Sequence, residues 1–182
     1  MTFPPGFDIK IDQWFVDNGL IKPSDFTMRA GLHYDLIREW SNRMNIVSKN
    51  DLEILLERHI LDSLTPITSI PDKGRLIDIG SGGGFPGIPI ALIRPELKII
   101  LLESRHKKAL FLQEAKKQLK LDNVSVEECR LEAFTSNSPF DIATIRALPQ
   151  WEKHLKRIKS LLRPEGYIIY YKRLGESEII NL

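Results

Sequence analysis

The segment 76–87 constrains the fold of this chain most, because it joins a short apolar run to a helix through a cluster of glycines. It reads Leu-Ile-Asp-Ile-Gly-Ser-Gly-Gly-Gly-Phe-Pro-Gly, and Pro86 and Pro89 lie where proline suits the first turn of a helix. A strand, a glycine turn and a helix N-terminus together let backbone N–H groups approach a ligand closely. A second apolar run, 98–102, is followed by Glu103, about 20 residues past the glycines, where a βαβ unit holds a ribose. The sequence therefore predicts a site for an adenosine-type cofactor.

The chain divides into two regions with different hydrophobic patterns. Residues 1–70 show helical spacing only, with helices predicted at 11–18, at 25–43 and from 50 or 51 to about 64. From residue 75 onward, strands alternate with helices, which is typical of a parallel sheet with helices on both faces. The predicted strands are 75–79, 98–103, 124–128, 140–145 and 166–171, and the predicted helices are 87–94, 105–120 and 150–163, with a short piece near 131–135. We therefore expect an α/β fold with an N-terminal helical cap over 1–70 and a cofactor-binding domain over 71–182.

The amino-acid composition limits the classes of protein to which this chain can belong. The 182 residues are 42% hydrophobic and 27% charged, and a net charge of +2 is too small to argue for nucleic acid by itself. Cys129 is the only cysteine, which excludes an internal disulfide and a cysteine-rich zinc site, and no metal is expected. No stretch reaches the roughly 18 apolar residues of a membrane helix, and residues 1–10 lack the pattern of a secretory signal. A cytoplasmic protein without a membrane partner is expected.

The register of the glycines separates two cofactor classes. In the dinucleotide-binding fingerprint the first glycine ends the strand, which is Gly80 here, and the third would then fall on Phe85. Phenylalanine there would prevent the close helix–strand contact that the third glycine permits. The acid Asp78, two residues before Gly80, is instead similar to motif I of the S-adenosylmethionine-dependent methyltransferases, where we expect it to orient the glycine loop. An NAD(P)-dependent reductase stays open as an alternative.

Longer sequence motifs restrict the resemblance to one family of methyltransferases. Gly-Phe-Pro-Gly-Ile-Pro within 76–89 and Arg-His-Ile-Leu-Asp-Ser at 58–63 resemble the RsmG family, also called glucose-inhibited division protein B or GidB. Further matching strings, in family order from about residue 36 to 173, are 40–45, 94–96, 101–104, 107–112, 130–132 and 145–147. The resemblance implies a Rossmann-like fold and transfer of a methyl group from S-adenosylmethionine to N7 of one guanine in bacterial 16S ribosomal RNA. Because guanine N7 carries a free lone pair, such a transfer needs no general base.

The resemblance also implies roles for particular residues. The positions that match cofactor contacts are Gly80, Gly82, Gly84, Phe85, Glu103, Leu131, Glu132 and Arg146. The positions expected to face the RNA or to position the reacting base are Asn45, His59, Asp62 and Lys172. If the cap flanks the cofactor, further RNA contacts are expected from Arg38, Arg43, Lys49, Arg94 and Lys98. The implied partner is 16S ribosomal RNA or the small ribosomal subunit particle, bound by a monomer.

The last residues depart from the family pattern. The family continues past its fifth strand with a Lys-Gly pair and an antiparallel hairpin, whereas here Lys172 is followed by Arg173 and the sequence stops at Leu182. We therefore expect the C-terminal hairpin to be missing and a sheet edge to be exposed. On this ground a non-catalytic RNA-binding or ribosome-assembly protein that retains a cofactor pocket stays open as an alternative.

Overall fold

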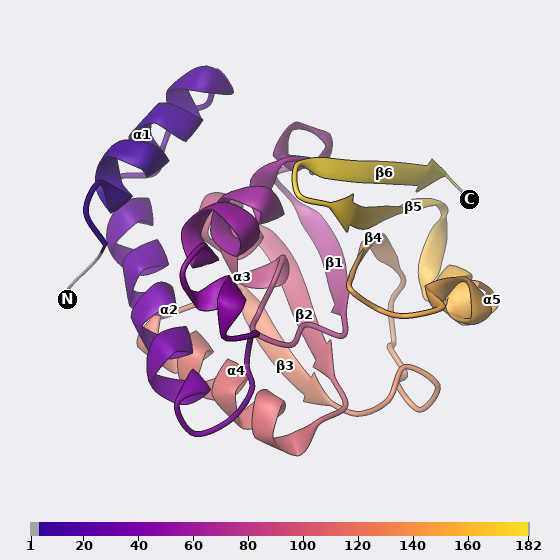
Figure 1. Ribbon diagram of the computed structural model, residues 1–182. Coiled ribbons are helices and arrows are strands. Elements are labelled where there is room, and N and C mark those ends of the chain that lie inside the picture. The colour runs from indigo at the N-terminus through magenta and orange to yellow at the C-terminus, as the bar shows by residue number, and fades with distance from the viewer. Residues whose placement is uncertain (1–3, 182) are drawn as a thin grey trace.

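A six-stranded sheet forms the centre of the computed structural model, which describes residues 4–181 (Figure 1). The strands are β1 (Gly74–Ile79), β2 (Leu97–Glu103), β3 (Val124–Glu128), β4 (Phe140–Arg146), β5 (Leu162–Arg173) and β6 (Glu176–Asn181). Their order across the sheet is β3-β2-β1-β4-β5-β6, and the pairs among β1 to β5 are parallel. This arrangement confirms the expected α/β class with a mostly parallel sheet.

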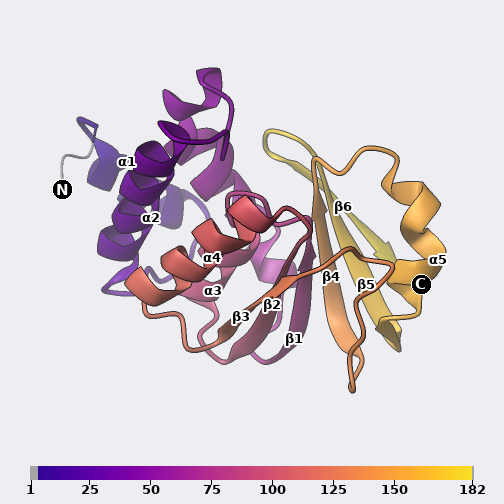
Figure 2. The same ribbon diagram turned by 90° about the horizontal axis from the view of Figure 1, so that it is seen from below.

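Helices cover both faces of the sheet (Figure 2). On one face lie α3 (Gly87–Ile93) and α4 (His106–Gln118), while the short α5 (Leu155–Lys159) lies on the other. The central strands are therefore apolar on both sides, and alternate residues of one strand enter different hydrophobic cores. In β1, Leu76 packs into the core that contains α3 and α4, whereas Ile77 packs into the core that contains Ile158 of α5.

Of the N-terminal helices, the second packs against the outside of α3 and α4, and the first contacts the segment 56–61 (Figure 2). The two helices are α1 (Phe7–Asp17) and α2 (Phe26–Ser41), and Phe26 and Ile37 of α2 are fully buried in the same hydrophobic core as Phe111 of α4. The expected helical cap is thus joined to the sheet through a shared apolar core. Over residues 4–181, none of the helices combines the length and hydropathy needed to cross a bilayer.

The third predicted helix, from residue 50 to about 64, is not continuous. It consists of 3₁₀ turns at Asn50–Leu52 and Asp62–Leu64 and a π-helical stretch at Leu56–Leu61. At its end the Ser63 hydroxyl donates to the His59 carbonyl, 2.5 Å away, and the Thr65 hydroxyl donates to the Asp62 carbonyl at the same distance. Hydroxyl groups that bond to main-chain carbonyls in this way compete with regular helical hydrogen bonds, so the apolar spacing alone was misleading.

The predicted helix 150–163 is also shorter than expected. A 3₁₀ turn at Trp151–His154 leads into α5, which ends at Lys159, and β5 already begins at Leu162. Leu162 pairs with Phe140 of β4, so residues that helical periodicity assigned to the helix belong to the sheet instead. The predicted short helical piece near 131–135 is a turn.

The expectation that the C-terminal hairpin is missing is wrong only in part, because one antiparallel strand, β6, follows β5 where the family pattern predicts a further pair of strands. After β5 the chain turns at Leu174-Gly175 and returns as β6, which pairs antiparallel with β5 from Tyr167↔Asn181 to Arg173↔Glu176 (Figure 1). Gly175 adopts the left-handed φ of +76° that the tight turn requires. The outer strand β6 carries the exposed acids Glu176 and Glu178, which suits a sheet edge because charge discourages pairing with another strand.

Candidate functional site

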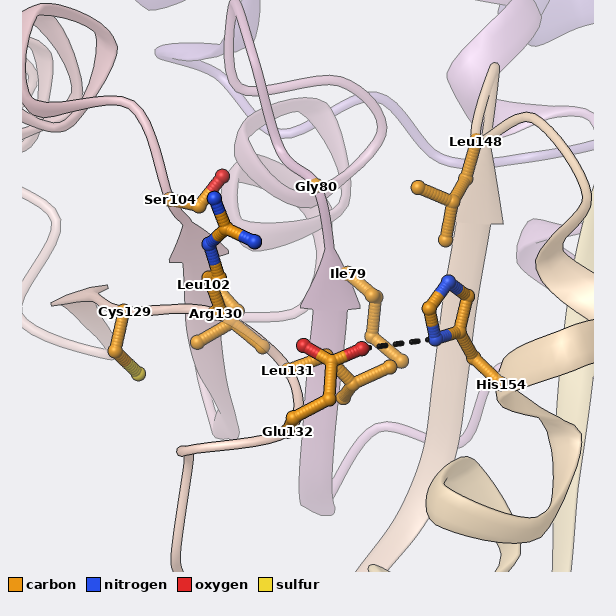
Figure 3. A pocket seen from close by; sticks show the side chains of 10 residues that line it. All are labelled: Ile79, Gly80, Leu102, Ser104, Cys129, Arg130, Leu131, Glu132, Leu148 and His154. Atoms are coloured by element: carbon orange, nitrogen blue, oxygen red, sulfur yellow. Dashed lines mark ion pairs between the residues drawn. The ribbon is translucent and has the colours of Figure 1, made fainter.

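Two cavities open at the carboxyl ends of the strands and meet at Gly80, directly after β1. The first, which we call the strand-end cavity, has a volume of about 230 Å³ and lies above β1 and β2 beside the loop after β3 (Figure 3). The second, which we call the loop cavity, has a volume of about 200 Å³ and lies between the glycine loop and the N-terminal segment, with Ile46, Asp51 and His59 in its wall. The strand order reverses between β1 and β4, and such reversal points are where open α/β sheets bind ligands.

The glycines of the loop serve two different purposes. A Cβ on Gly80 would meet no atom within 4 Å, so the missing side chain leaves space that belongs to the cavities. Gly82 is similarly open, with the Lys108 Nζ as its nearest neighbour at 3.6 Å. Gly84 lines neither cavity, and a Cβ there would lie 2.4 Å from the Cδ1 of Ile88. The prediction that Gly84 contacts the cofactor is therefore not supported by its position, because glycine is required there for packing.

The carboxylate of Asp78, in β1, holds the glycine loop in place through hydrogen bonds. Its Oδ1 accepts a hydrogen bond of 2.8 Å from the Thr144 hydroxyl, and its Oδ2 accepts one of 3.2 Å from the backbone N–H of Gly87. Burial raises the pKa of this carboxyl to about 6, against which the hydrogen bonds from Thr144, Ser81 and Gly87 act. These contacts agree with the interpretation of Asp78 as an orienting residue.

The close contact between helix and strand is made by Gly87 rather than by a glycine at position 85. A Cβ on Gly87 would lie 2.3 Å from the Cδ2 of Leu101 in β2 and 2.9 Å from the Asp78 carboxylate. The argument that Phe85 would prevent such an approach is thus corrected, because the approach occurs two residues later, at the first residue of α3.

Glu103 lies at the end of β2 with both carboxylate oxygens directed to backbone N–H groups. Its Oε2 accepts from Gly82 at 2.9 Å, and its Oε1 accepts from Arg105 at 2.8 Å. Each oxygen has a second lone pair, so the carboxylate can still accept hydroxyl donors from a ligand. The side chain is therefore placed between the glycine loop and the start of α4 in a way that fits a ribose.

The loop after β3 forms the wall of the strand-end cavity opposite β1 (Figure 3). Leu131 and Glu132 both line this cavity, and Glu132 forms an ion pair of 2.9 Å with the Nδ1 of His154. Arg157 of α5 donates to the carbonyls of Leu131 and Phe134, which fixes the loop. His154 and Arg157 were not predicted, because their partners lie more than 20 residues away in the sequence.

Arg146 extends from the end of β4 to the N-terminal segment rather than only toward a ligand. Its Nη2 forms an ion pair of 2.9 Å with Asp62, whose side chain is 3% exposed, and it also donates to the carbonyl of Arg58. The other oxygen of Asp62 accepts a hydrogen bond of 2.6 Å from the N–H of Gly175. Asp62, predicted to face RNA, is instead a buried link between β4, the N-terminal segment and the β5–β6 turn. Arg146 itself still lines the loop cavity.

Phe85 lies between two histidine rings that come from the N-terminal segment. His59 and His33 each have their ring centroid 5.0 Å from that of Phe85. His33 is buried, and its Nε2–H donates to the Gly83 carbonyl at 2.9 Å, so α2 holds the glycine loop directly. His33 was missed, although a histidine between Ala30 and Ile37 on an apolar helix stripe indicates a buried polar contact.

His59 lines the loop cavity. Its nearest acid is Asp51, whose Oδ2 lies 3.7 Å from Nε2, and within residues 4–181 this buried nitrogen has no hydrogen-bond partner. Burial lowers the pKa of His59 to about 4, and the positive charge of Arg146 contributes to the shift. The imidazole is therefore neutral near pH 7 and presents an unsatisfied nitrogen at the site.

Asp51 is a site residue that the sequence analysis missed. It lines the loop cavity, accepts a hydrogen bond of 2.6 Å from the Ser48 hydroxyl and pairs with Arg58 at 3.2 Å. Burial opposes its ionisation, but the Ser48 hydrogen bond, together with the nearby His59 and Arg58, outweighs this, so its pKa lies below the ordinary value. The spacing of Ser48 and Asp51, typical of a helix start, was the available indication.

The remaining predicted residues lie apart from one another. Asn45 is exposed on the outer side of the loop cavity, and Lys172 is at the β5–β6 hairpin, where it pairs with Glu178 at 2.5 Å. Of the cations expected to face RNA, Arg43 pairs with Glu39 and Arg94 pairs with Asp72, while Lys49 lies beside Asn45. The site thus gathers the glycine loop, Glu103, the 131–132 loop, His59 and Arg146, but not Lys172.

Together these features fit an adenosine-containing ligand. The two adjoining cavities approach the size of small-molecule sites, about 300–1000 Å³, and the Gly80 position provides a cradle that a Cβ would fill. The apolar side chains of Ile79, Leu102 and Leu131 line the strand-end cavity, where they suit a flat base. Glu103 lines neither cavity, but its hydrogen bond with the N–H of Gly82 places its carboxylate beside the glycine loop, where it suits a ribose.

Acidification is expected to destabilise the fold through His33. Burial lowers the pKa of His33 from its ordinary 6.5 to about 4, so below pH 6.5 the unfolded chain binds a proton that the folded chain resists. The stability supplied by the neutral ring is present above pH 6.5 and is lost as the pH falls toward 4, at up to about 1.4 kcal/mol per pH unit. Urea unfolding at pH 7 and pH 5 measures this. His33→Gln keeps a donor for Gly83 but cannot titrate, so equal losses in both proteins would contradict the assignment.

Comparison with known proteins places the chain in a family. The family model described as rRNA small subunit methyltransferase G, named GidB, matches residues 28–181. The chain is 36% identical over 151 residues to "Ribosomal RNA small subunit methyltransferase G" of Syntrophotalea carbinolica, which covers 81% of this chain and 70% of that relative. It is 39% identical over 153 residues to the protein of the same name from Neisseria meningitidis serogroup B, covering 84% and 73%.

Solved structures agree on the fold. A putative O-methyltransferase from Klebsiella pneumoniae superimposes with a TM-score of 0.56 at 18% identity, over 88% of this chain and 70% of that one. TYW2 of M. jannaschii, solved in complex with AdoMet, gives a TM-score of 0.57 at 18% identity, over 68% and 53%. At this identity the likeness concerns the fold, which is the Rossmann-like fold of S-adenosylmethionine-dependent methyltransferases. With its family model and its relatives matched over most of its length, this chain belongs to the GidB family of rRNA small subunit methyltransferase G proteins.

Proposed function

We propose that this protein transfers the methyl group of S-adenosylmethionine to N7 of a guanine in 16S ribosomal RNA. The observation that carries the proposal is the meeting of two cavities at Gly80, one suited to an adenosine and the other open to a second reactant. Family membership supplies the class of nucleic acid, since the relatives are named for small-subunit ribosomal RNA. When bound, the cofactor supplies an electrophilic methyl group on a sulfonium.

For the cofactor, the proposal assigns the strand-end cavity to the adenosine. Glu103 would accept hydrogen bonds from the ribose hydroxyls, and the loop at Leu131 and Glu132 would frame the adenine. Gly80 and Gly82 would allow the ligand to approach the backbone, because neither has a neighbour that fills the space of a Cβ. Phe85, held between His33 and His59, would form the boundary between the loop and the second reactant.

For the acceptor, the loop cavity has a suitable chemical lining. A guanine N7 needs no proton removed, so the weak basicity of His59, which lies close to Phe85 and whose pKa burial lowers to about 4, is compatible with the reaction. The methylated ring is cationic, and the ionised Asp51 in the cavity wall would stabilise that charge. Catalysis would then depend on holding the reactants in line, which model reactions value at about 7–11 kcal/mol.

The proposal gives the N-terminal residues 1–70 the role of a cap that completes the acceptor site. Ile46, Val47, Asp51 and His59 all come from this part and line the loop cavity opposite the glycine loop. We further propose that the enzyme works as a cytoplasmic monomer on 16S ribosomal RNA or on the small-subunit particle. No group of metal-binding side chains occurs within residues 4–181, and the proposed reaction requires no metal.

Transfer of a tritiated methyl group to 16S ribosomal RNA from cells that lack the modification tests the proposal. The expected result is incorporation that depends on the protein and maps to one guanine N7. Cofactor binding without incorporation into either naked RNA or small-subunit particles would instead indicate the non-catalytic RNA-binding alternative. Enhanced fluorescence of a reduced nicotinamide, without heat on titration with S-adenosylmethionine, would indicate the reductase.

A further inference from the structure

A third recess adjoins the loop cavity on its outer side. We call it the basic recess; it has a volume of about 530 Å³ and is formed by residues 45–49 together with Arg105 and Lys108 at the start of α4. It shares Ile46, Val47 and Lys108 with the loop cavity. A molecule lying in the basic recess would therefore be directly connected to the proposed methyl-acceptor position.

The cations of the basic recess are not neutralised by ion pairs with any residue from 4 to 181. Within residues 4–181, the side chains of Lys49, Arg105 and Lys108 form no ion pair or hydrogen bond, and no carboxylate lines the recess. Lys49 and Arg105 are exposed, whereas Lys108 is half-buried. Burial lowers the pKa of Lys108, and only the nearby Glu103, which already accepts two backbone N–H groups, acts against this. Lys49 and Arg105 thus carry positive charge that no ion pair neutralises, whereas the charge of Lys108 is partly offset by Glu103.

The other approach to the loop cavity, between the N-terminal segment and the β5–β6 hairpin, differs in this respect. It also holds cations, but Arg58 pairs with Asp51, Arg146 with Asp62 and Lys172 with Glu178. Among the cations that line it, only Arg173 lacks an acid partner within residues 4–181. A polyanion gains less from cations that are already neutralised, because binding to them requires an existing ion pair to be broken.

We propose that the basic recess binds backbone phosphates of the substrate RNA beside the target nucleotide, so that the base enters the loop cavity past Ile46 and Val47. The inference rests on the proposed function and adds which surface holds the RNA. Phosphate is the expected ligand because the recess offers two long exposed cations, from separate elements, without an acid between them. It predicts that the RNA follows the start of α4 rather than the β5–β6 hairpin.

Lys49→Gln and Arg105→Gln test this inference, with Lys117→Gln as the matched control. Lys117 is an exposed lysine near the other end of α4, so the control removes one positive charge from a place away from the recess. Binding of unmodified 16S ribosomal RNA is measured between 50 and 200 mM salt, and binding of S-adenosylmethionine by calorimetry. Each recess variant is expected to bind RNA several-fold more weakly and to reduce the slope of log affinity against log salt by about 0.7 to 1. The affinity of each recess variant for S-adenosylmethionine is expected to match that of the wild type. The affinity of the Lys117→Gln control for RNA is also expected to match that of the wild type.

Three outcomes would overturn the inference. RNA affinity and salt slope equal to those of the wild type would remove the recess from the RNA-binding surface. A similar loss in Lys117→Gln would show that only overall charge matters. Loss of affinity for S-adenosylmethionine with unchanged RNA binding would assign the recess to the cofactor carboxylate. If the wild type itself transferred no methyl group, the proposed function would fail instead, which keeps the two tests separate.

Discussion

Replacement of Gly80 by valine is expected to abolish cofactor binding while the chain stays folded. Gly80 lies where the strand-end cavity and the loop cavity meet, and a side chain there would enter the space of the ligand, since no protein atom lies within 4 Å of its Cβ position. A loss of at least about 100-fold in affinity, or about 2.7 kcal/mol, is expected. Calorimetric titration with S-adenosylmethionine measures it, and thermal unfolding checks the fold.

Gly175 offers a closely matched control for this experiment. Both glycines have a φ of +76°, and for both a Cβ would meet no atom within 4 Å. Valine at either position therefore imposes the same backbone strain, of order 1–2 kcal/mol. Gly175→Val lies at the β5–β6 turn, away from both cavities, and is expected to lower stability without affecting cofactor binding. Similar affinities in the two variants would show that strain, not occupation of the site, is responsible.

Arg146→Ala is expected to destabilise the fold strongly as well as to impair catalysis. Arg146 is the ion-pair partner of the buried Asp62 and bonds to the carbonyls of Arg58 and His59, so it joins β4 to the N-terminal segment. Its removal leaves the Asp62 carboxylate buried without its cation, and breaking such a pair from one side costs about 3–5 kcal/mol. The free energy of unfolding in urea is the measurement.

Arg163→Ala is the control for the ion pair. Arg163 pairs with Asp141 at 3.0 Å, but its side chain is 49% exposed, so its loss is expected to cost about 1 kcal/mol or less. Equal stability of the wild type and Arg146→Ala, with methyl transfer lost, would contradict the bridging role and would restore the simpler prediction that Arg146 serves the cofactor alone.

The positions of the central strands followed directly from the sequence. The ranges predicted for β1, β2, β3 and β4 agree with the structure to within one residue at each end. These strands are apolar runs bounded by turns. Strands that are buried on both faces of a sheet need such runs, whichever strands they pair with. The glycine loop was similarly clear, because Gly80, Gly82 and Gly84 all adopt a positive φ that other residues rarely accept.

Segments whose conformation depends on distant partners were predicted poorly. The region from residue 50 to about 64 has helical spacing, but it forms 3₁₀ turns and a π-helical stretch, and hydroxyl groups bond to main-chain carbonyls at its end. β5 begins earlier than expected because Leu162 pairs with Phe140 of β4. β6 forms because its backbone pairs antiparallel with that of β5. In these segments, contacts with residues distant in the sequence outweigh the local preference for helix or strand.

By itself, the sequence determined the strand, glycine loop and acid that can hold an adenosine, since each is a local pattern with a conformational requirement of its own. Only the tertiary structure decided how the N-terminal segment completes the site: His33 bonds to Gly83, Asp62 takes Arg146, and Asp51 enters the loop cavity. The physical reason is that a buried polar group must find a partner wherever the fold brings one within reach, and that partner can lie 50 or more residues away.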